Sequence, residues 1–181
     1  LEIFGFNTTA FLLWPGVIAA AVVAGYYVYR HRLPLALMLD AFAPGLLVGL
    51  AIAATGALLA GRNAGAAADL PWAVDLWGVR RHPVQAYEAL GFLAVAAAAL
   101  GRLKIENGRW KIGVREARRG TVALTALLGF GLVKWFVEAF RPPEVTATIL
   151  GGVRSSQVIG LALALIALIA LRARARRTED Q

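Results

Sequence analysis

"LPLALMLDAFAPGLLVGLAIAATGALL", Leu33 to Leu59, is the stretch that decides the fold, because Asp40 is its only charged residue. About 20 consecutive apolar residues suffice for a helix to cross a hydrocarbon core roughly 30 Å thick. The stretch therefore predicts a transmembrane helix. Pro44 removes the hydrogen bond to the carbonyl of residue 40, which predicts a kink there, with Asp40 capping or hydrating the broken turn.

Four more apolar spans lie on either side of this one, and 59% of the 181 residues are hydrophobic, against roughly 45 to 50% in soluble domains. They run from about Ala10 to Tyr29, His82 to Leu100, Thr121 to Phe140 and Ser155 to Leu171. We therefore expect an all-α, polytopic integral membrane bundle of about five transmembrane helices, forming a single domain over 1–181.

Basic residues predict the orientation, because cytoplasmic loops carry an excess of Lys and Arg. The loops on one side hold thirteen of the 19 Lys and Arg residues and those on the other side hold five. We expect a cytoplasmic connector at about 101–120, a basic cytoplasmic tail at 172–181, and outer loops at about 61–81 and 141–154. The net charge of +8 then indicates anionic headgroups rather than nucleic acid.

The chain has no cysteine, so it can form no disulfide and offers neither a thiol nucleophile nor a sulfur ligand for a metal. It begins with Leu1, and the opening residues lack the basic region of a signal peptide. We expect further residues upstream.

Charged residues inside the spans are candidates for function, since each costs several kcal/mol unless it is paired or hydrated. In "KWFVEAFR", Lys134, Glu138 and Arg141 are spaced i, i+4, i+7 and share one helix stripe, where Glu138 can bridge two cations. Two interpretations stay open: an ion-pair ladder that fixes helix packing, or a binding site for a lipid headgroup.

"RHPVQAYE", Arg81 to Glu88, is a second polar cluster at a helix mouth. His82, Gln85 and Glu88 recur every three residues and line one face, while Pro83 falls early in the helix, where its missing N–H does no harm. A histidine at this place is either a cap or interfacial residue, or a base.

Glycines follow the second span in "TGALLAGRNAG", at Gly56, Gly61 and Gly65. Glycine lets backbone approach another backbone or a ligand closely. The spacing alone does not say which.

"LPWAV", "RHPVQAYE", "FVEAFR" and the glutamine that opens the last span, Gln157, stand in an order that resembles the prolipoprotein diacylglyceryl transferase family. The resemblance runs from about Trp14 to Leu171 and leaves out the family's first two spans. It implies a multi-pass protein of the bacterial inner (cytoplasmic) membrane that moves diacylglyceryl from phosphatidylglycerol to the lipobox cysteine of a prolipoprotein. It implies no metal and no cofactor other than the phospholipid itself.

The resemblance also assigns residues to two groups. Those matching the family's polar motifs would bind the lipid headgroup, and they are Arg81, His82, Gln85, Tyr87, Glu88, Lys134, Glu138, Arg141 and Gln157. Those matching its central helix and signature would be structural, and they are Asp40, Pro44, Gly56, Gly61 and Gly65.

Departures from the family pattern fall where its chemistry is expected. The signature Gly-Arg-x-Gly-Asn-Phe-x-Asn-Gly-Glu reads here "AATGALLAGR", so the arginine, both asparagines and the glutamate are Ala54, Ala57, Ala60 and Arg62. An alanine in place of arginine removes the planar guanidinium that binds a phosphate through two hydrogen bonds.

Two more departures affect the proton chemistry and the second cation. The family's histidine aligns with Trp14, whose indole can only donate, and its tyrosine and arginine become Phe130 and Lys134. Loss of a base typically costs about 10²- to 10⁴-fold in rate.

We therefore expect a catalytically impaired relative that binds phospholipid or serves as a structural subunit of a larger membrane complex. The alternative is an active phosphatidylglycerol:prolipoprotein diacylglyceryl transferase in which His82, Glu138 and Arg62 carry a modified site. An unrelated small transporter or assembly factor is a third interpretation. The expected partners are the bilayer, anionic phospholipid, and either other membrane subunits or a prolipoprotein.

Overall fold

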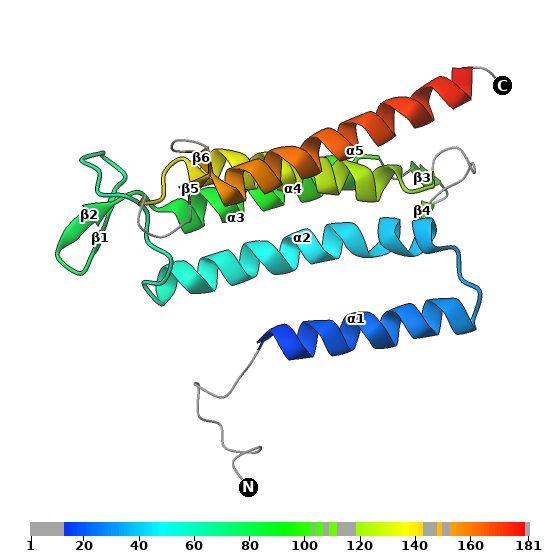
Figure 1. The fold of residues 1–181 in the computed structure, drawn as a ribbon, viewed down its shortest axis with the longest axis horizontal. Coiled ribbons are helices and arrows are strands. Elements are labelled where there is room, and N and C mark those ends of the chain that lie inside the picture. Colours follow the sequence, from blue (N-terminus) through cyan, green and yellow to red (C-terminus); the bar gives the residue numbers. More distant parts are fainter. Residues whose placement is uncertain are drawn as a thin grey trace, which may run out of the picture.

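The computed structural model describes residues 13–102, 104–106, 109–111, 119–142, 148–149 and 153–179, and it is mostly helical (Figure 1). The helices of these residues are α1 (Leu13–Arg30), α2 (Leu35–Leu59), α3 (Val84–Leu100), α4 (Thr121–Glu138) and α5 (Ser155–Glu179). Each coincides with one of the five expected spans. Residues 10–12 of the first span lie outside the described residues.

Three of the described helices are long and apolar enough to cross a membrane: α2, α4 and α5 over Ser155–Arg176. The apolar α3 is shorter. The helix α1, which carries Pro15, three tyrosines and Arg30, is not among the three. The expectation of an all-α membrane bundle is confirmed.

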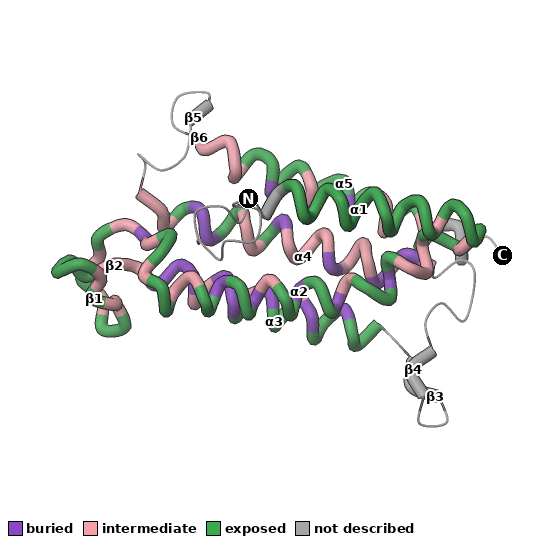
Figure 2. The backbone as a smooth tube through the Cα atoms, turned by 90° about the horizontal axis from the view of Figure 1, so that it is seen from below, coloured by how far each residue is buried: buried purple, intermediate pink, exposed green. Residues whose placement is uncertain are grey.

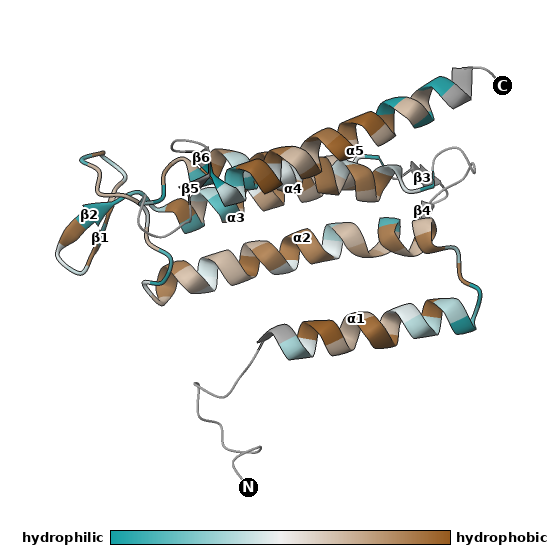
Figure 3. Cartoon of the chain, viewed as in Figure 1, coloured by the Kyte–Doolittle hydropathy of each residue, from teal (hydrophilic) through white to brown (hydrophobic). Residues whose placement is uncertain are grey.

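The bundle is built from α2 to α5: α2 packs on α3 and α4, α3 packs on α4, and α4 packs on α5. The helix α1 lies apart from the others and is exposed over almost its whole length (Figures 1 and 2). Figure 3 shows that apolar residues predominate in the helices, and many large apolar side chains are exposed, among them Leu46, Ile52 and Ile166. Apolar side chains on an outer face are what a hydrocarbon solvent requires.

Small residues make the core of the bundle. Leu47, Ala51 and Ala54 of α2 lie against Phe92 and Ala96 of α3 in one buried cluster. Lipid tails are as apolar as Leu, so helices in a membrane associate through close packing, which small residues allow.

The backbones of α4 and α5 approach each other closely at Gly131 and Gly160. A Cβ on Gly131 would overlap the carbonyl oxygen of Gly160, and a Cβ on Gly160 would lie 2.8 Å from the carbonyl oxygen of Gly131. No side chain fits between the two backbones at this point.

Three short hairpins connect the helices, and the sequence patterns did not predict them. They pair β1 (Val74–Leu76) with β2 (Val79–Arg81), β3 (Lys104–Glu106) with β4 (Arg109–Lys111), and β5 (Thr148–Ile149) with β6 (Val153–Arg154). In the first, Trp77 and Gly78 have φ of 63° and 74°, as a two-residue turn of the I′ type requires. This hairpin falls inside the expected outer loop 61–81.

Asp40 serves a different helix from the one expected. It is 1% exposed, and its Oδ2 and Oδ1 accept hydrogen bonds from the backbone N–H groups of Gly120 and Ala123, at 2.5 and 2.8 Å. The helix α4 starts with no capping side chain of its own, so its first N–H groups need an acceptor from elsewhere. Asp40 therefore caps α4 rather than the turn that Pro44 interrupts, and α2 continues through Pro44.

Candidate functional site

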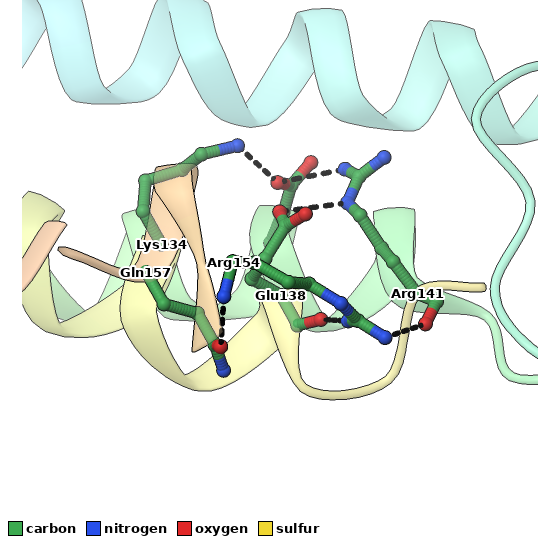
Figure 4. A network of polar contacts seen from close by, with 6 residues as sticks. Lys134, Glu138, Arg141, Arg154 and Gln157 are labelled. Atoms are coloured by element: carbon green, nitrogen blue, oxygen red, sulfur yellow. Dashed lines mark hydrogen bonds and ion pairs between the residues drawn. The ribbon is translucent and has the colours of Figure 1, made fainter. Parts of the chain in front are cut away.

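Glu88 of α3 pairs with two cations, Lys134 of α4 and Arg141 just past the end of α4, and Figure 4 labels both cations. Its Oε1 lies 2.7 Å from Lys134 Nζ and 3.1 Å from Arg141 Nη2. Glu88 is 8% exposed, whereas the side chain of Lys134 is 31% exposed. The carboxylate that bridges the two cations is therefore Glu88, and the expected bridge through Glu138 is wrong.

Of the cations Lys134 and Arg141, Glu138 pairs with Arg141, and its Oε2 lies 3.4 Å from Arg141 Nε. That distance meets the limit for an ion pair, but Arg141 Nε has no partner with hydrogen-bond geometry. The helix ends at Glu138 and tightens into i→i−3 hydrogen bonds from Ala139 N to Phe136 O and from Arg141 N to Glu138 O. Arg141 thus lies past the helix and off the expected stripe, because Pro142 cannot continue a helix.

Arg154 holds this helix end from the far side of the loop (Figure 4). Its guanidinium donates to the carbonyl oxygens of Glu138 and, at 2.5 Å, of Arg141. The last carbonyls of a helix have no intrahelical donor, and prolines after the helix supply no N–H. The prolines after α4 indicate from the sequence that its last carbonyls need a donor from elsewhere. The sequence does not indicate that Arg154 is this donor.

Gln157 stands in the first turn of α5 beside Arg154. Its Oε1 lies 3.4 Å from the backbone N–H of Arg154, as in a helix N-cap. Gln157 therefore orients the residue that closes the end of α4.

The segment "RHPVQ", at the start of α3, is hydrogen-bonded to the loop after α2. Arg81 Nη1 donates to Gly65 O at 3.3 Å, and Gln85 Nε2 donates to Arg62 O. A Cβ on Gly65 would overlap the carbonyl oxygen of His82, so only glycine fits. Of the three expected glycines, Gly65 shows the close approach between backbones.

The other two glycines have different surroundings. Gly61 has a φ of 62° and faces the ring of Trp77, whose nearest atom would be 3.3 Å from a Cβ. Nothing lies within 4 Å of a Cβ on Gly56. Gly56 is therefore not a packing glycine in the described part of the chain.

His82 contacts aromatic neighbours. Its Nδ1 lies 3.4 Å from the hydroxyl of Tyr87, which accepts a hydrogen bond of 2.8 Å from Trp72 Nε1. The ring of Phe140 lies 5.0 Å from the His82 ring. The link from Trp72 to Tyr87 was not expected from the sequence.

The three candidate catalytic residues are not joined to one another. No hydrogen bond or ion pair of His82 to Glu138 or to Arg62 exists in the described part of the chain. The side chain of Arg62 is exposed, and Glu138 is 4% exposed.

The residues that the resemblance places in the family signature are mostly apolar here. Ala54 belongs to the core cluster, Ala57 is half-buried and Ala60 is exposed. Phe130 stacks on Phe92 with ring centroids 5.7 Å apart. The side chain of Trp14 lies outside the described residues.

Within the described ranges, no group of three or more His, Cys, Asp or Glu side chains could hold a metal ion. The charged groups that the structure brings together here are Lys, Arg and carboxylate side chains. Lys134 and Arg141 pair with the carboxylates of Glu88 and Glu138, whereas the third cation, Arg154, donates to backbone carbonyl oxygens. Among these five described side chains there are three positive and two negative groups.

Residues 1–173 match the family model described as prolipoprotein diacylglyceryl transferase. Among curated proteins, the chain is similar to phosphatidylglycerol–prolipoprotein diacylglyceryl transferases of Finegoldia magna (26% identical over 93% of the chain), Geobacter sulfurreducens (31% over 76%) and Rhodospirillum centenum (36% over 84%). The matches cover 63, 51 and 54% of those relatives. The chain thus spans between half and two thirds of their length.

Proposed function

The chain belongs to the prolipoprotein diacylglyceryl transferase family, and from this we propose that it binds the headgroup of an anionic phospholipid in the bacterial inner membrane and transfers diacylglyceryl poorly or not at all. The relatives' names supply phosphatidylglycerol as the lipid and a prolipoprotein as the acceptor. A chain that binds phospholipid without transferring it would act as a phospholipid-binding or structural subunit of a larger membrane complex.

The exposure of Lys134 beside Glu88 is the observation that supports lipid binding. Lys134 and Arg141 are paired with Glu88 and Glu138, and Lys134 is the most exposed side chain of these pairs, at 31%. An ammonium has three donors, and Lys134 uses one on Glu88, which leaves donors for a phosphate oxygen. A charge-assisted hydrogen bond in a poorly hydrated place is among the stronger polar interactions.

The altered signature segment supports impaired transfer. Ala54 is packed in the core and has no donor to offer where the family has an arginine. In the described part of the chain, His82 lies 3.4 Å from the Tyr87 hydroxyl and has no hydrogen bond or ion pair with Glu138, so these two residues do not form a histidine–carboxylate pair that would act as a base. A thiol would therefore have to react without the activation that the family's residues provide.

Purified protein tests both parts. We expect Lys134→Met to weaken phosphatidylglycerol binding by about tenfold or more, the worth of one charge-assisted hydrogen bond. Arg80→Gln is the control, because Arg80 is exposed and pairs with the exposed Asp69. Equal affinity of Lys134→Met and the parent protein would refute the headgroup site.

Transfer is measured in parallel, with phosphatidylglycerol and a lipobox peptide as substrates. We expect no lipidated thiol above a control without protein. Lipidation at the rate of an intact relative would favour the active-transferase alternative with His82, Glu138 and Arg62, and would refute impairment without touching the binding result.

A further inference from the structure

The outer face of α5 changes character along its length. Val158, Leu161, Leu165 and Ile169 are 41 to 66% exposed. Arg172 and Arg176, which are also exposed, continue the same stripe. At 100° per residue, all six positions fall within about 80° of one another around the helix. One exposed stripe therefore runs from apolar to cationic.

The position of the change fits the boundary of a bilayer. Arg172 lies 17 residues, or about 26 Å, along the helix from Ser155, close to the thickness of a hydrocarbon core of roughly 30 Å. Long arginine side chains near a helix end reach toward the headgroups. The apolar part of the stripe would then contact acyl chains, and the two arginines would lie at headgroup level.

Arg174, between them, has a different task. It turns inward and donates to the backbone carbonyl of Arg119 at the start of α4, next to Gly120. This contact fixes the rotation of the last turns of α5 relative to α4. Within the part of the chain that the structure describes, Arg172 and Arg176 have no hydrogen bond or ion pair, so their donors are free for a ligand.

We propose that this face of α5, from Leu165 to Arg176, is a binding surface for one class of partner, an anionic phospholipid of the leaflet at that end. Two guanidinium groups one helical turn apart match the oxygens of a phosphate, and Leu165 and Ile169 lie beside its acyl chains. A zwitterionic lipid lacks the net charge that the two arginines select. Figure 1 shows the last turns of α5 at the opposite end of the bundle from the start of α3, which carries Glu88, so this surface does not depend on the function proposed there.

The absence of cysteine allows a local measurement. Ile169→Cys, at a site 66% exposed, provides a single thiol for a fluorophore in the full chain. Brominated phosphatidylglycerol and brominated phosphatidylcholine then quench the label in proteoliposomes, and the ratio of the two gives the local preference for the anionic lipid.

We expect the labelled parent to prefer phosphatidylglycerol over phosphatidylcholine. Each of the substitutions Arg172→Gln and Arg176→Gln should lower this preference about fivefold, and a double variant should carry both losses. Arg30→Gln with Arg32→Gln is the matched control, because it removes two exposed arginines from the same predicted side of the membrane. The control should keep the preference. An equal loss in both double variants would show only general attraction to the leaflet, and no preference in the parent would also overturn the proposal.

Discussion

At the scale of single residues, Glu88 connects the two cations Lys134 and Arg141 near the end of α4. One of its oxygens accepts from an ammonium and from a guanidinium, and the residue is 8% exposed. A carboxylate in such a place is stable only while its cations are present, and the cations likewise depend on it. Glu88 therefore links α3 to α4 as well as setting the charge of the site.

Glu88→Gln is expected to lower the free energy of unfolding by about 3 kcal/mol, the lower end for breaking a buried ion pair, because Lys134 is partly exposed. The thermal unfolding midpoint in detergent micelles measures this. Asp69→Asn is the control, since Asp69 and Arg80 are exposed at 93 and 50% and such pairs contribute little. Equal midpoints for Glu88→Gln and the parent would show that the network does not stabilise the fold.

At the scale of elements, α4 depends on its neighbours at both ends. Asp40 of α2 accepts from N–H groups at its start, and Arg154, just before α5, donates to the carbonyl of its last residue, Glu138, and to that of Arg141 beyond it. Neither contact comes from the sequence of α4 itself. The helix is thereby fixed in position between α2 and α5.

Asp40→Ala is expected to destabilise the start of α4, because loss of a cap costs about 0.5 to 2 kcal/mol and leaves buried N–H groups unpaired. Hydrogen exchange at the amides of Gly120 and Ala123 should then quicken, by up to about 30-fold if the full cost appears in local opening. Asp40→Asn, which keeps one acceptor, should have a smaller effect. Unchanged protection in the alanine variant would contradict the cap.

The helices could be predicted from the sequence far better than the contacts between them. Long apolar runs place the starts of α2 and α3 within two residues, at Leu35 and Val84, and α5 runs beyond the expected Leu171 because alternating Ala and Arg are strong helix formers. The partner of Lys134 was assigned to Glu138, since periodicity describes one helix only. The true partner, Glu88, depends on how α3 and α4 are aligned, which no single-helix pattern contains.

At the scale of the whole molecule, the polar features divide between two ends. The start of α3, the end of α4 and the first hairpin lie at one end, and the basic ends of α1 and α5 lie at the other (Figures 1 and 3). This division agrees with the sequence-based orientation, in which 61–81 faces outward and the basic end faces the cytoplasm. That orientation stays a prediction.

Cysteine labelling tests it directly, because the parent chain has no thiol. Trp77→Cys, at a site 82% exposed in the hairpin, should react with a membrane-impermeant maleimide in cells with a permeabilised outer envelope and intact inner membrane. Arg102→Cys, at the opposite end, should react only after the inner membrane is opened. The reverse pattern would invert the assigned topology, and the cysteine-free parent controls for background.

The contact between Gly131 and Gly160 couples the movements of α4 and α5. Because the backbones of α4 and α5 touch there, neither helix can slide or roll without carrying the other along. A tilt of the C-terminal end of α5 would be transmitted through this contact to Arg154, which donates to the carbonyls of Glu138 and Arg141. An alanine at either glycine would add a methyl group where the two backbones touch and would push α4 and α5 apart. A movement at one end of the bundle would then no longer be transmitted to the other end.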